Sequence, residues 1–161
     1  MARHEGGYSE GFLGRYLPYL IRQADQALSA PFYAVLTRSG VARSEWRVLA
    51  VLQELGELSV AELAAAALSP QPTVTHALRR LEQRGLVTRT VSTVDRRQRL
   101  ATITPAGSTL TATLITEATR LEAEALAGAG DLSELVARLQ ELTALVESRS
   151  GVPADGEVLT A

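Results

Sequence analysis

Seven arginines lie between Ser69 and Thr104, where they could bind an anion together. They are Arg79, Arg80, Arg84, Arg89, Arg96, Arg97 and Arg99. Only two acids, Glu82 and Asp95, share that stretch, so it carries a formal charge of +5 on a chain whose net charge is −2. Guanidinium groups present planar sets of N–H donors that suit phosphates and the edge of guanine. A positive surface on an otherwise acidic molecule predicts a polyanionic partner.

Hydroxyl, amide and imidazole side chains precede these arginines at helical spacing. Apolar residues cluster on one face of a helix expected at about 70–84, and these are Val74, Ala77, Leu78 and Leu81. The opposite face would expose Pro72, His76, Arg79 and Gln83, flanked by Thr73, Thr75 and Arg80. Ser69 is the expected N-cap. The pattern therefore predicts an exposed basic helix rich in hydrogen-bond donors. For His76, surface exposure without base contact is the alternative. We expect Glu82 and Arg84 to be solvated helix surface.

Other chemistries have little support in the composition. The chain has no cysteine, which excludes disulfides, thiolate nucleophiles and iron–sulfur clusters within it. His4 and His76 are far apart in sequence, so a zinc site would have to depend on carboxylates. No paired nucleophile and base and no phosphate-binding loop is present, so we expect neither an enzyme nor a cofactor. Without a long apolar run or a secretory signal pattern, we expect a cytoplasmic protein.

The elements that must position these residues can be read from periodicity and capping patterns. Residues 12–36 carry an apolar stripe that predicts a long helix, with a kink or break at Pro31. Ser44 is expected to cap a second helix that ends at Gly56. Ser59 and Glu62 have the spacing of a capping box that would start a short third helix.

The carboxyl-terminal half alternates between strands and helices. Residues 86–92 and 98–104 are rich in β-branched side chains and predict two short strands joined by a turn. Thr104 is expected to restart a helix, and Asp131 with Glu134 would cap the last one, whose apolar repeat is close to a heptad. We expect residues 150–161 to form a flexible tail.

This order of parts predicts a mainly α protein with a small two-stranded β-wing: a winged helix-turn-helix core flanked by long dimerisation helices. The expected regions are 10–38 and 105–149 for dimerisation and 42–104 for DNA binding, with the recognition helix at about 70–84 and the wing at about 86–104. The outer apolar stripes are wider than one small lobe can cover, which favours a symmetric homodimer. Such a dimer would place two recognition helices about 34 Å apart and bind an inverted repeat of roughly 16 to 20 base pairs.

The stretch LSVAELAAAALSPQPTVTHALRRLEQRGLVTRTVSTVDRRQRLATITPAG resembles the MarR family of bacterial transcription regulators. The resemblance depends on T-V-T followed by L-E-x-x-G-L-V, and on D-R-R followed by T-P-x-G; with SEWRVLAVL it covers residues 44–107. It implies a DNA-binding repressor relieved by a small aromatic or phenolic effector. It also implies that Asp95 orients an arginine of the wing and that Arg97 reaches a minor groove. Pro72 and His76 depart from the residues usual in the family.

Taken together, the residues expected to contact DNA are Ser69, Gln71, Thr73, Thr75, His76, Arg79, Arg80, Arg96, Arg97 and Arg99. A solvated hairpin tip is the alternative for the last three. Aromatic residues near the amino terminus predict core and dimer packing, or else an effector pocket formed by Tyr16, Tyr19, Arg22 and Trp46. The rival function is a winged-helix protein-interaction module that does not bind DNA.

Overall fold

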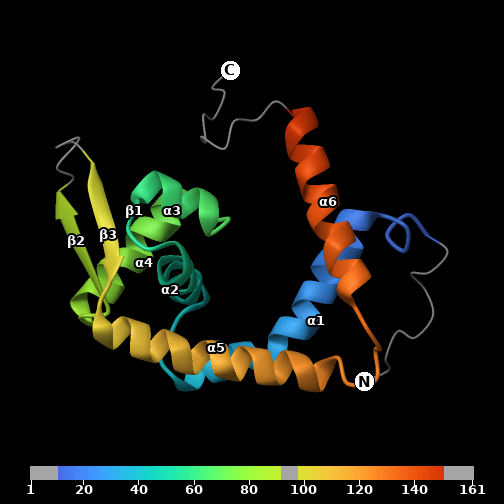
Figure 1. Ribbon diagram of the computed structural model, residues 1–161, viewed down its shortest axis with the longest axis horizontal. Helices are drawn as coiled ribbons and strands as arrows, with labels where there is room; N and C mark the ends of the chain where they lie inside the picture. The colour runs from blue at the N-terminus through green and yellow to red at the C-terminus, as the bar shows by residue number, and fades with distance from the viewer. Residues whose placement is uncertain (1–10, 92–97, 151–161) are drawn as a thin grey trace.

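The computed structural model describes residues 11–91 and 98–150, which form a mainly helical chain with one small sheet. The elements are α1 (Leu17–Arg38), α2 (Arg43–Leu55), β1 (Leu58–Ser59), α3 (Val60–Ala66), α4 (Gln71–Gln83), β2 (Val87–Val91), β3 (Arg99–Ile103), α5 (Pro105–Ala125) and α6 (Ser133–Ser150). Figure 1 shows a lobe of α2, α3, α4 and the sheet at one end of α5, with α6 and part of α1 at the other. The predicted fold class is confirmed.

The sheet is antiparallel and has the strand order β1-β3-β2. Its β2–β3 hairpin is the predicted wing, with Val87 opposite Ile103 and Val91 opposite Arg99. The strand β1 was not predicted, because two residues are too short to show a periodicity. It pairs with the far edge of β3 and joins the wing to the start of α3. The predicted turn residues Asp95, Arg96 and Arg97 lie outside the described residues.

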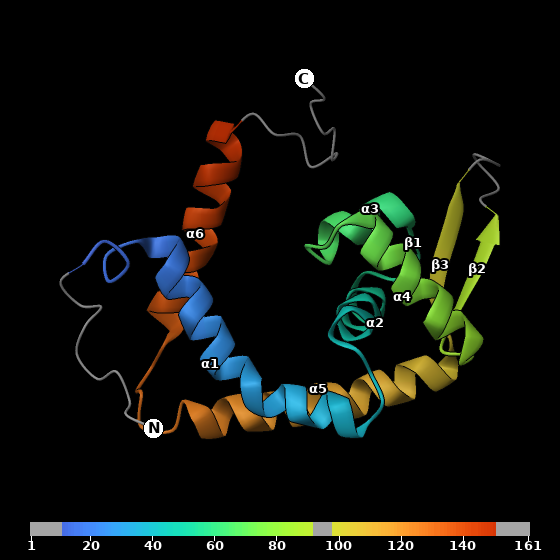
Figure 2. The same ribbon diagram turned by 180° about the vertical axis from the view of Figure 1, so that it is seen from behind.

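The helix α1 is shorter at its start than expected and continues through its internal proline. It begins at Leu17 rather than residue 12, with Pro18 in its first turn, where a missing N–H costs no helical hydrogen bond. Pro31 does not break it, and Figure 2 shows the helix bending along its length. Among the described residues, no helix is both long and apolar enough to span a membrane.

The strongest predicted cap is confirmed. The Ser59 amide donates to the Glu62 carboxylate at 2.8 Å, and the Glu62 amide donates to the Ser59 hydroxyl at 3.3 Å. Thr104 likewise caps α5, because its hydroxyl accepts the Gly107 amide.

Two other predicted caps are wrong, and a third forms only in part. Ser44 lies inside α2, whose N-cap is Ala42, because the Glu45 side chain accepts the Ala42 amide at 2.8 Å. Ser69 turns back to donate to the Ala67 carbonyl, and Pro70 precedes α4 instead. Asp131 accepts the amide of Ser133, the first residue of α6, but Glu134 forms no hydrogen bond back to Asp131 in the described part of the chain, so the predicted box is incomplete. A local sequence pattern cannot show which turn or tertiary contact a serine or aspartate side chain will form in the folded chain.

The core has two parts. One fills the lobe and includes the four predicted residues of α4, of which each is at most 1% exposed. The other joins α1 to α5 through Phe32, Leu36, Val41 and Leu114, and Trp46 of α2 packs against it. This second cluster fixes the lobe on the long helices, so the orientation of α4 depends on the α1–α2–α5 junction.

Candidate nucleic-acid interface

Helix α4 presents an exposed polar face beside the β2–β3 hairpin. Its opposite face is buried in the lobe, and this burial leaves Pro72, His76, Arg79 and Gln83 exposed, as predicted. The flanking residues Thr73, Thr75 and Arg80 are exposed as well. The surface is therefore available to a partner without any rearrangement of the core.

A hydrogen bond links the two longest side chains near the middle of this face. The Arg79 guanidinium lies 3.0 Å from Nδ1 of His76, measured from its Nη2. Because a guanidinium can only donate, Nδ1 must accept and the imidazole proton is assigned to Nε2. His76 and Arg79 together thus present N–H donors to solvent. Donors of this kind match the N7 and O6 acceptors that guanine shows in the major groove.

Two hollows lie between α4 and the hairpin. The smaller, of about 210 Å³, is lined by Pro72, Thr75, His76, Arg79 and Arg89. The larger, of about 450 Å³, is lined by Ser59, Val60, Ala61, Gln71, Thr75, Arg89, Gln98 and Arg99. Thr75 and Arg89 belong to both. The predicted residues Gln71, Thr75, His76, Arg79 and Arg99 are thus brought together around one concave surface.

Arg89 was not among the predicted contact residues, although it lines both hollows. Its Nε donates to the Glu82 carboxylate at 3.0 Å, and its Nη2 contacts the same oxygen. The hydrogen bond from Arg89 holds the pKa of Glu82 below its ordinary value. Glu82 is exposed, as predicted, but it also holds Arg89, which the prediction of plain solvated surface did not include. The available signal was the opposite charge seven residues later, at the place where the chain turns from α4 into β2.

Glu45 was also missed, and it is the most deeply buried charged side chain among the described residues, with no exposed surface. It accepts the Arg80 Nε at 2.6 Å, and Arg84 lies 3.4 Å from its other oxygen. Arg84 also donates to the Gly40 carbonyl at 2.9 Å, so it is not merely solvated surface either. The pattern held a signal, since Glu45 shares a helical stripe with Val48, Leu49 and Leu52. A carboxylate on an apolar stripe needs a partner.

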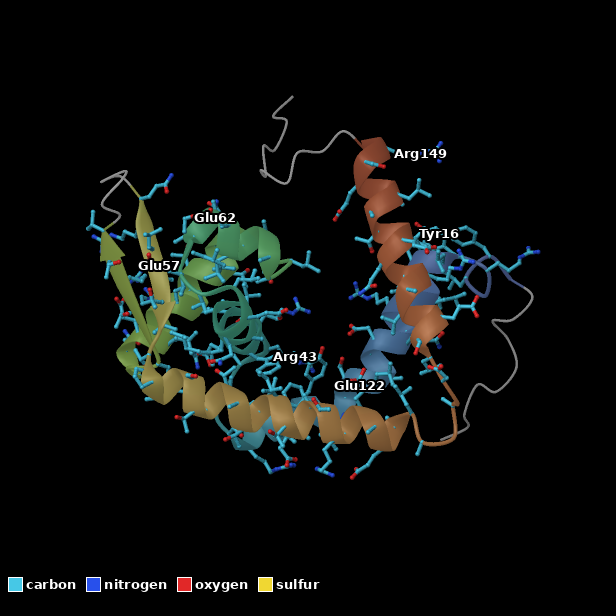
Figure 3. All side chains as sticks on the ribbon, viewed as in Figure 1. Tyr16, Arg43, Glu57, Glu62, Glu122 and Arg149 are labelled. Atoms are coloured by element: carbon cyan, nitrogen blue, oxygen red, sulfur yellow. The ribbon has the colours of Figure 1, made fainter. Side chains whose placement is uncertain are left out.

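The residues predicted to bind an effector fall into two groups within one chain. Tyr16, Tyr19 and Arg22 lie at the start of α1, whereas Trp46 on α2 packs edge-on against Phe32 at 4.9 Å. The helical rise places Tyr19 roughly 20 Å along α1 from Phe32. Figure 3 shows Tyr16 at the end of the molecule that holds α6, and Arg43, from the first turn of α2, near the middle. Tyr16 stacks on Phe12 and is half exposed.

The α1–α2 junction itself is rich in aromatic contacts. The Arg43 guanidinium lies over the Tyr33 ring, 3.6 Å from its centre, and Tyr33 and Trp46 both pack against the second core cluster. Core packing thus accounts for part of the aromatic set, as one of the two interpretations expected. Within residues 11–91 and 98–150, no cluster of three or more His, Asp or Glu side chains could hold a metal ion.

Comparisons with known proteins agree with this geometry. The MarR family model matches residues 39–98. The chain is 31% identical over 145 residues to the homoprotocatechuate degradative operon repressor of Escherichia coli, which covers 88% of this chain and 97% of the relative.

Solved structures show the same fold. A MarR family transcriptional regulator from Silicibacter pomeroyi has a TM-score of 0.74 at 29% identity, covering 85% of this chain and 99% of the other. NadR, solved in complex with 4-hydroxyphenylacetate, has a TM-score of 0.68 at 26% identity, covering 83% and 96%. The present chain belongs to the MarR family of transcriptional regulators.

Proposed function

We propose that this chain acts in the cytoplasm as a homodimeric repressor that binds an inverted repeat in double-stranded DNA. The observation that carries the proposal is the exposed face of α4, where His76 and Arg79 line one hollow with Arg89, and Arg89 lines the neighbouring hollow with Arg99. A helix and an adjacent basic hairpin suit a major groove and the neighbouring backbone. Arg96 and Arg97 would extend the contact from the hairpin.

A second copy of the chain is the proposed partner of the outer helices. Large apolar side chains stay exposed on α1 and α6, and these are Leu17, Leu20, Ile21, Leu28, Leu135, Val136, Leu139, Leu145 and Val146. Exposed apolar surface of this extent marks an interaction site. A twofold axis would cover both stripes at once and set the spacing of the two α4 helices.

The proposed effector is a small aromatic acid. The relative from Escherichia coli is named for the degradation of homoprotocatechuate, and NadR binds 4-hydroxyphenylacetate. These molecules share a ring, a hydroxyl group and a carboxylate. Trp46 offers an aromatic wall at the junction of α1 and α2, with Arg43 as a nearby cation. Because Tyr16, Tyr19 and Arg22 lie far from Trp46 along the same chain, they would join such a site only from a partner chain or line a second one.

Binding to the promoter region of its own gene tests the DNA-binding function. We expect the purified protein to shift this DNA at low salt in preference to a shuffled fragment, and to lose affinity steeply as salt rises. Arg97→Ala should weaken binding and leave dimerisation intact. Failure of the wild-type protein to bind at low salt would favour the protein-interaction module instead.

A further inference from the structure

Two carboxylates lie behind the DNA-binding face, and each holds an arginine through its Nε. Glu45 on α2 holds Arg80, and Glu82 on α4 holds Arg89 of β2. Acids so close to a surface that must bind phosphates would repel DNA. Their positions therefore need an explanation beyond net charge.

The Glu45 pair is built into the core. Its carboxylate is fully buried and also accepts the Ala42 amide, so neither oxygen can follow a moving arginine. Arg80 donates through Nε, while its two η nitrogens form no hydrogen bond or ion pair with another described residue, and its side chain is 51% exposed. The Nε of the guanidinium is therefore held at Glu45, and the two η nitrogens are left to donate to a partner outside the lobe.

The Glu82 pair has the same design on the other side. Arg89 uses Nε and Nη2 on one carboxylate oxygen, and its Nη1 is left for a further acceptor. Arg89 is only 21% exposed, but its exposed part lines both hollows. It therefore faces the concave surface between α4 and the hairpin.

The two pairs lie on opposite flanks of α4. Arg80 and Glu82 are two positions apart in the helix, which separates them by roughly 160° around its axis. Their flanks border the exposed face that carries His76 and Arg79. A helix in a major groove about 12 Å wide has one phosphate strand along each flank. Each arginine is thus placed toward a different strand.

Building on the DNA-binding function proposed above, we propose that Glu45 and Glu82 are positioning residues for DNA binding. They hold Arg80 and Arg89 so that each contacts a phosphate of one of the two strands beside α4. A guanidinium that is already fixed loses little side-chain entropy when it binds phosphate. The gain from this fixing exceeds the repulsion between the carboxylate and DNA, because each acid is neutralised by the arginine that it holds.

The direction in which DNA affinity changes when one of these acids is removed provides the test. Removing an acid from a DNA-binding face strengthens binding if the acid only repels DNA. We expect Glu82→Gln instead to weaken binding of the labelled promoter fragment about three- to tenfold, as loss of a fixed hydrogen-bonding geometry would. Arg89→Ala should weaken it further and reduce the slope of log affinity against log salt by about one phosphate contact. In the Arg89→Ala background this loss should disappear: Glu82→Gln should leave affinity unchanged or raise it, because Glu82 then holds no arginine and its charge is no longer neutralised.

Glu45→Gln, Arg80→Ala and their combination form the same double-mutant cycle on the other flank of α4. Because Glu45 is buried, the melting temperature of each of these variants is measured as well, to check that it is folded. Glu82 is partly exposed, so its cycle does not depend on a buried change. Glu54→Gln is the matched control, since the Glu54 side chain is exposed on α2 and forms no ion pair with an arginine in the described part of the chain. It should leave affinity unchanged or slightly higher.

The positioning role is overturned if Glu82→Gln binds as tightly as the wild type or more tightly, or if its effect and that of Arg89→Ala add independently. A wild-type protein that does not bind the fragment at low salt contradicts the DNA-binding function itself. The two failures are therefore distinguishable.

Discussion

The carbonyl oxygen of Leu86 leaves no space for a side chain on Gly107. A Cβ atom built on Gly107 would lie 2.1 Å from that oxygen and 2.9 Å from the Ile103 side chain. The same oxygen accepts the Thr104 amide at 3.0 Å, so it is held in place where the hairpin meets α5. Close packing therefore explains the glycine of the T-P-x-G pattern: the first turn of α5 lies directly against Leu86, the residue before β2.

Gly107→Ala should destabilise the protein by about 2 kcal/mol or more, because backbone atoms cannot move aside as a flexible side chain can. Urea unfolding followed by circular dichroism measures the change. Gly11→Ala is the control, since a Cβ there meets nothing within 4 Å. Equal unfolding midpoints for the two variants would contradict the close packing at Gly107.

Ser59→Ala should cost about 1 kcal/mol at neutral pH, because it removes the acceptor for an amide in the first turn of α3. Hydrogen bonds from Ser59, chiefly its side chain, hold the pKa of Glu62 below its ordinary value of 4.5. A carboxyl group whose pKa is lower in the folded state stabilises the protein at pH values above its unfolded-state pKa. This stabilisation is lost as the pH falls through the folded-state pKa. The difference between wild type and variant should therefore narrow below about pH 4.5.

Ser44→Ala is the matched control for this series, because Ser44 lies inside α2 and caps nothing in the structure. Its unfolding free energy should stay within about 0.5 kcal/mol of the wild type. A cost for Ser44→Ala as large as that of Ser59→Ala would restore Ser44 as a cap.

Arg79→Ala should weaken binding to the preferred DNA sequence by about 1 to 3 kcal/mol and relax the preference at one position. The physical reason is that Arg79 and His76 supply donors in the middle of the exposed face of α4. Selection from a randomised DNA library measures the preference. Arg138→Ala on α6 removes another exposed arginine, which pairs with Glu141, and it should leave the preferred sequence intact.

Leu139→Glu should convert the proposed dimer to monomers and abolish tight DNA binding. Leu139 is 40% exposed in the single chain, so the change costs little within one copy but places a charge in the proposed interface. Analytical ultracentrifugation measures the mass. Gln140→Glu introduces the same side chain at the next position, away from the apolar stripe, and should remain dimeric. A dimeric Leu139→Glu variant would place the interface elsewhere.

Helical periodicity was sufficient to predict the buried face of α4, because Val74, Ala77, Leu78 and Leu81 pack where their spacing puts them. It was not sufficient for the ion pair between Glu45 and Arg80, which are 35 residues apart and meet only after α2 packs on α4. Ser69 and Ser44 failed as caps for a related reason, since nearby groups compete for the same hydrogen bonds. Local patterns thus located the exposed face of α4, and tertiary contacts decide which of the arginines near it are held.

The fluorescence of Trp46 should report effector binding. Trp46 is the only tryptophan of the chain, and its ring packs against Phe32 at the junction of α1, α2 and α5. Titration with 4-hydroxyphenylacetate should change its emission with a saturating curve, and Arg43→Ala should raise the dissociation constant by removing a cation beside the site. Arg149→Ala, at the far end of α6, should not.

The same ligand should also lower affinity for the promoter fragment, by about 5- to 150-fold for a coupling of typical size. Thermodynamic linkage requires that saturating DNA raise the dissociation constant of the ligand by the same factor. The second core cluster joins the proposed effector site to the lobe that holds α4. A ligand that favours one packing of this junction would therefore change the distance between the two α4 helices of the proposed dimer. A saturating change in Trp46 emission without any change in DNA affinity would show that the junction binds the acid but does not regulate the repressor.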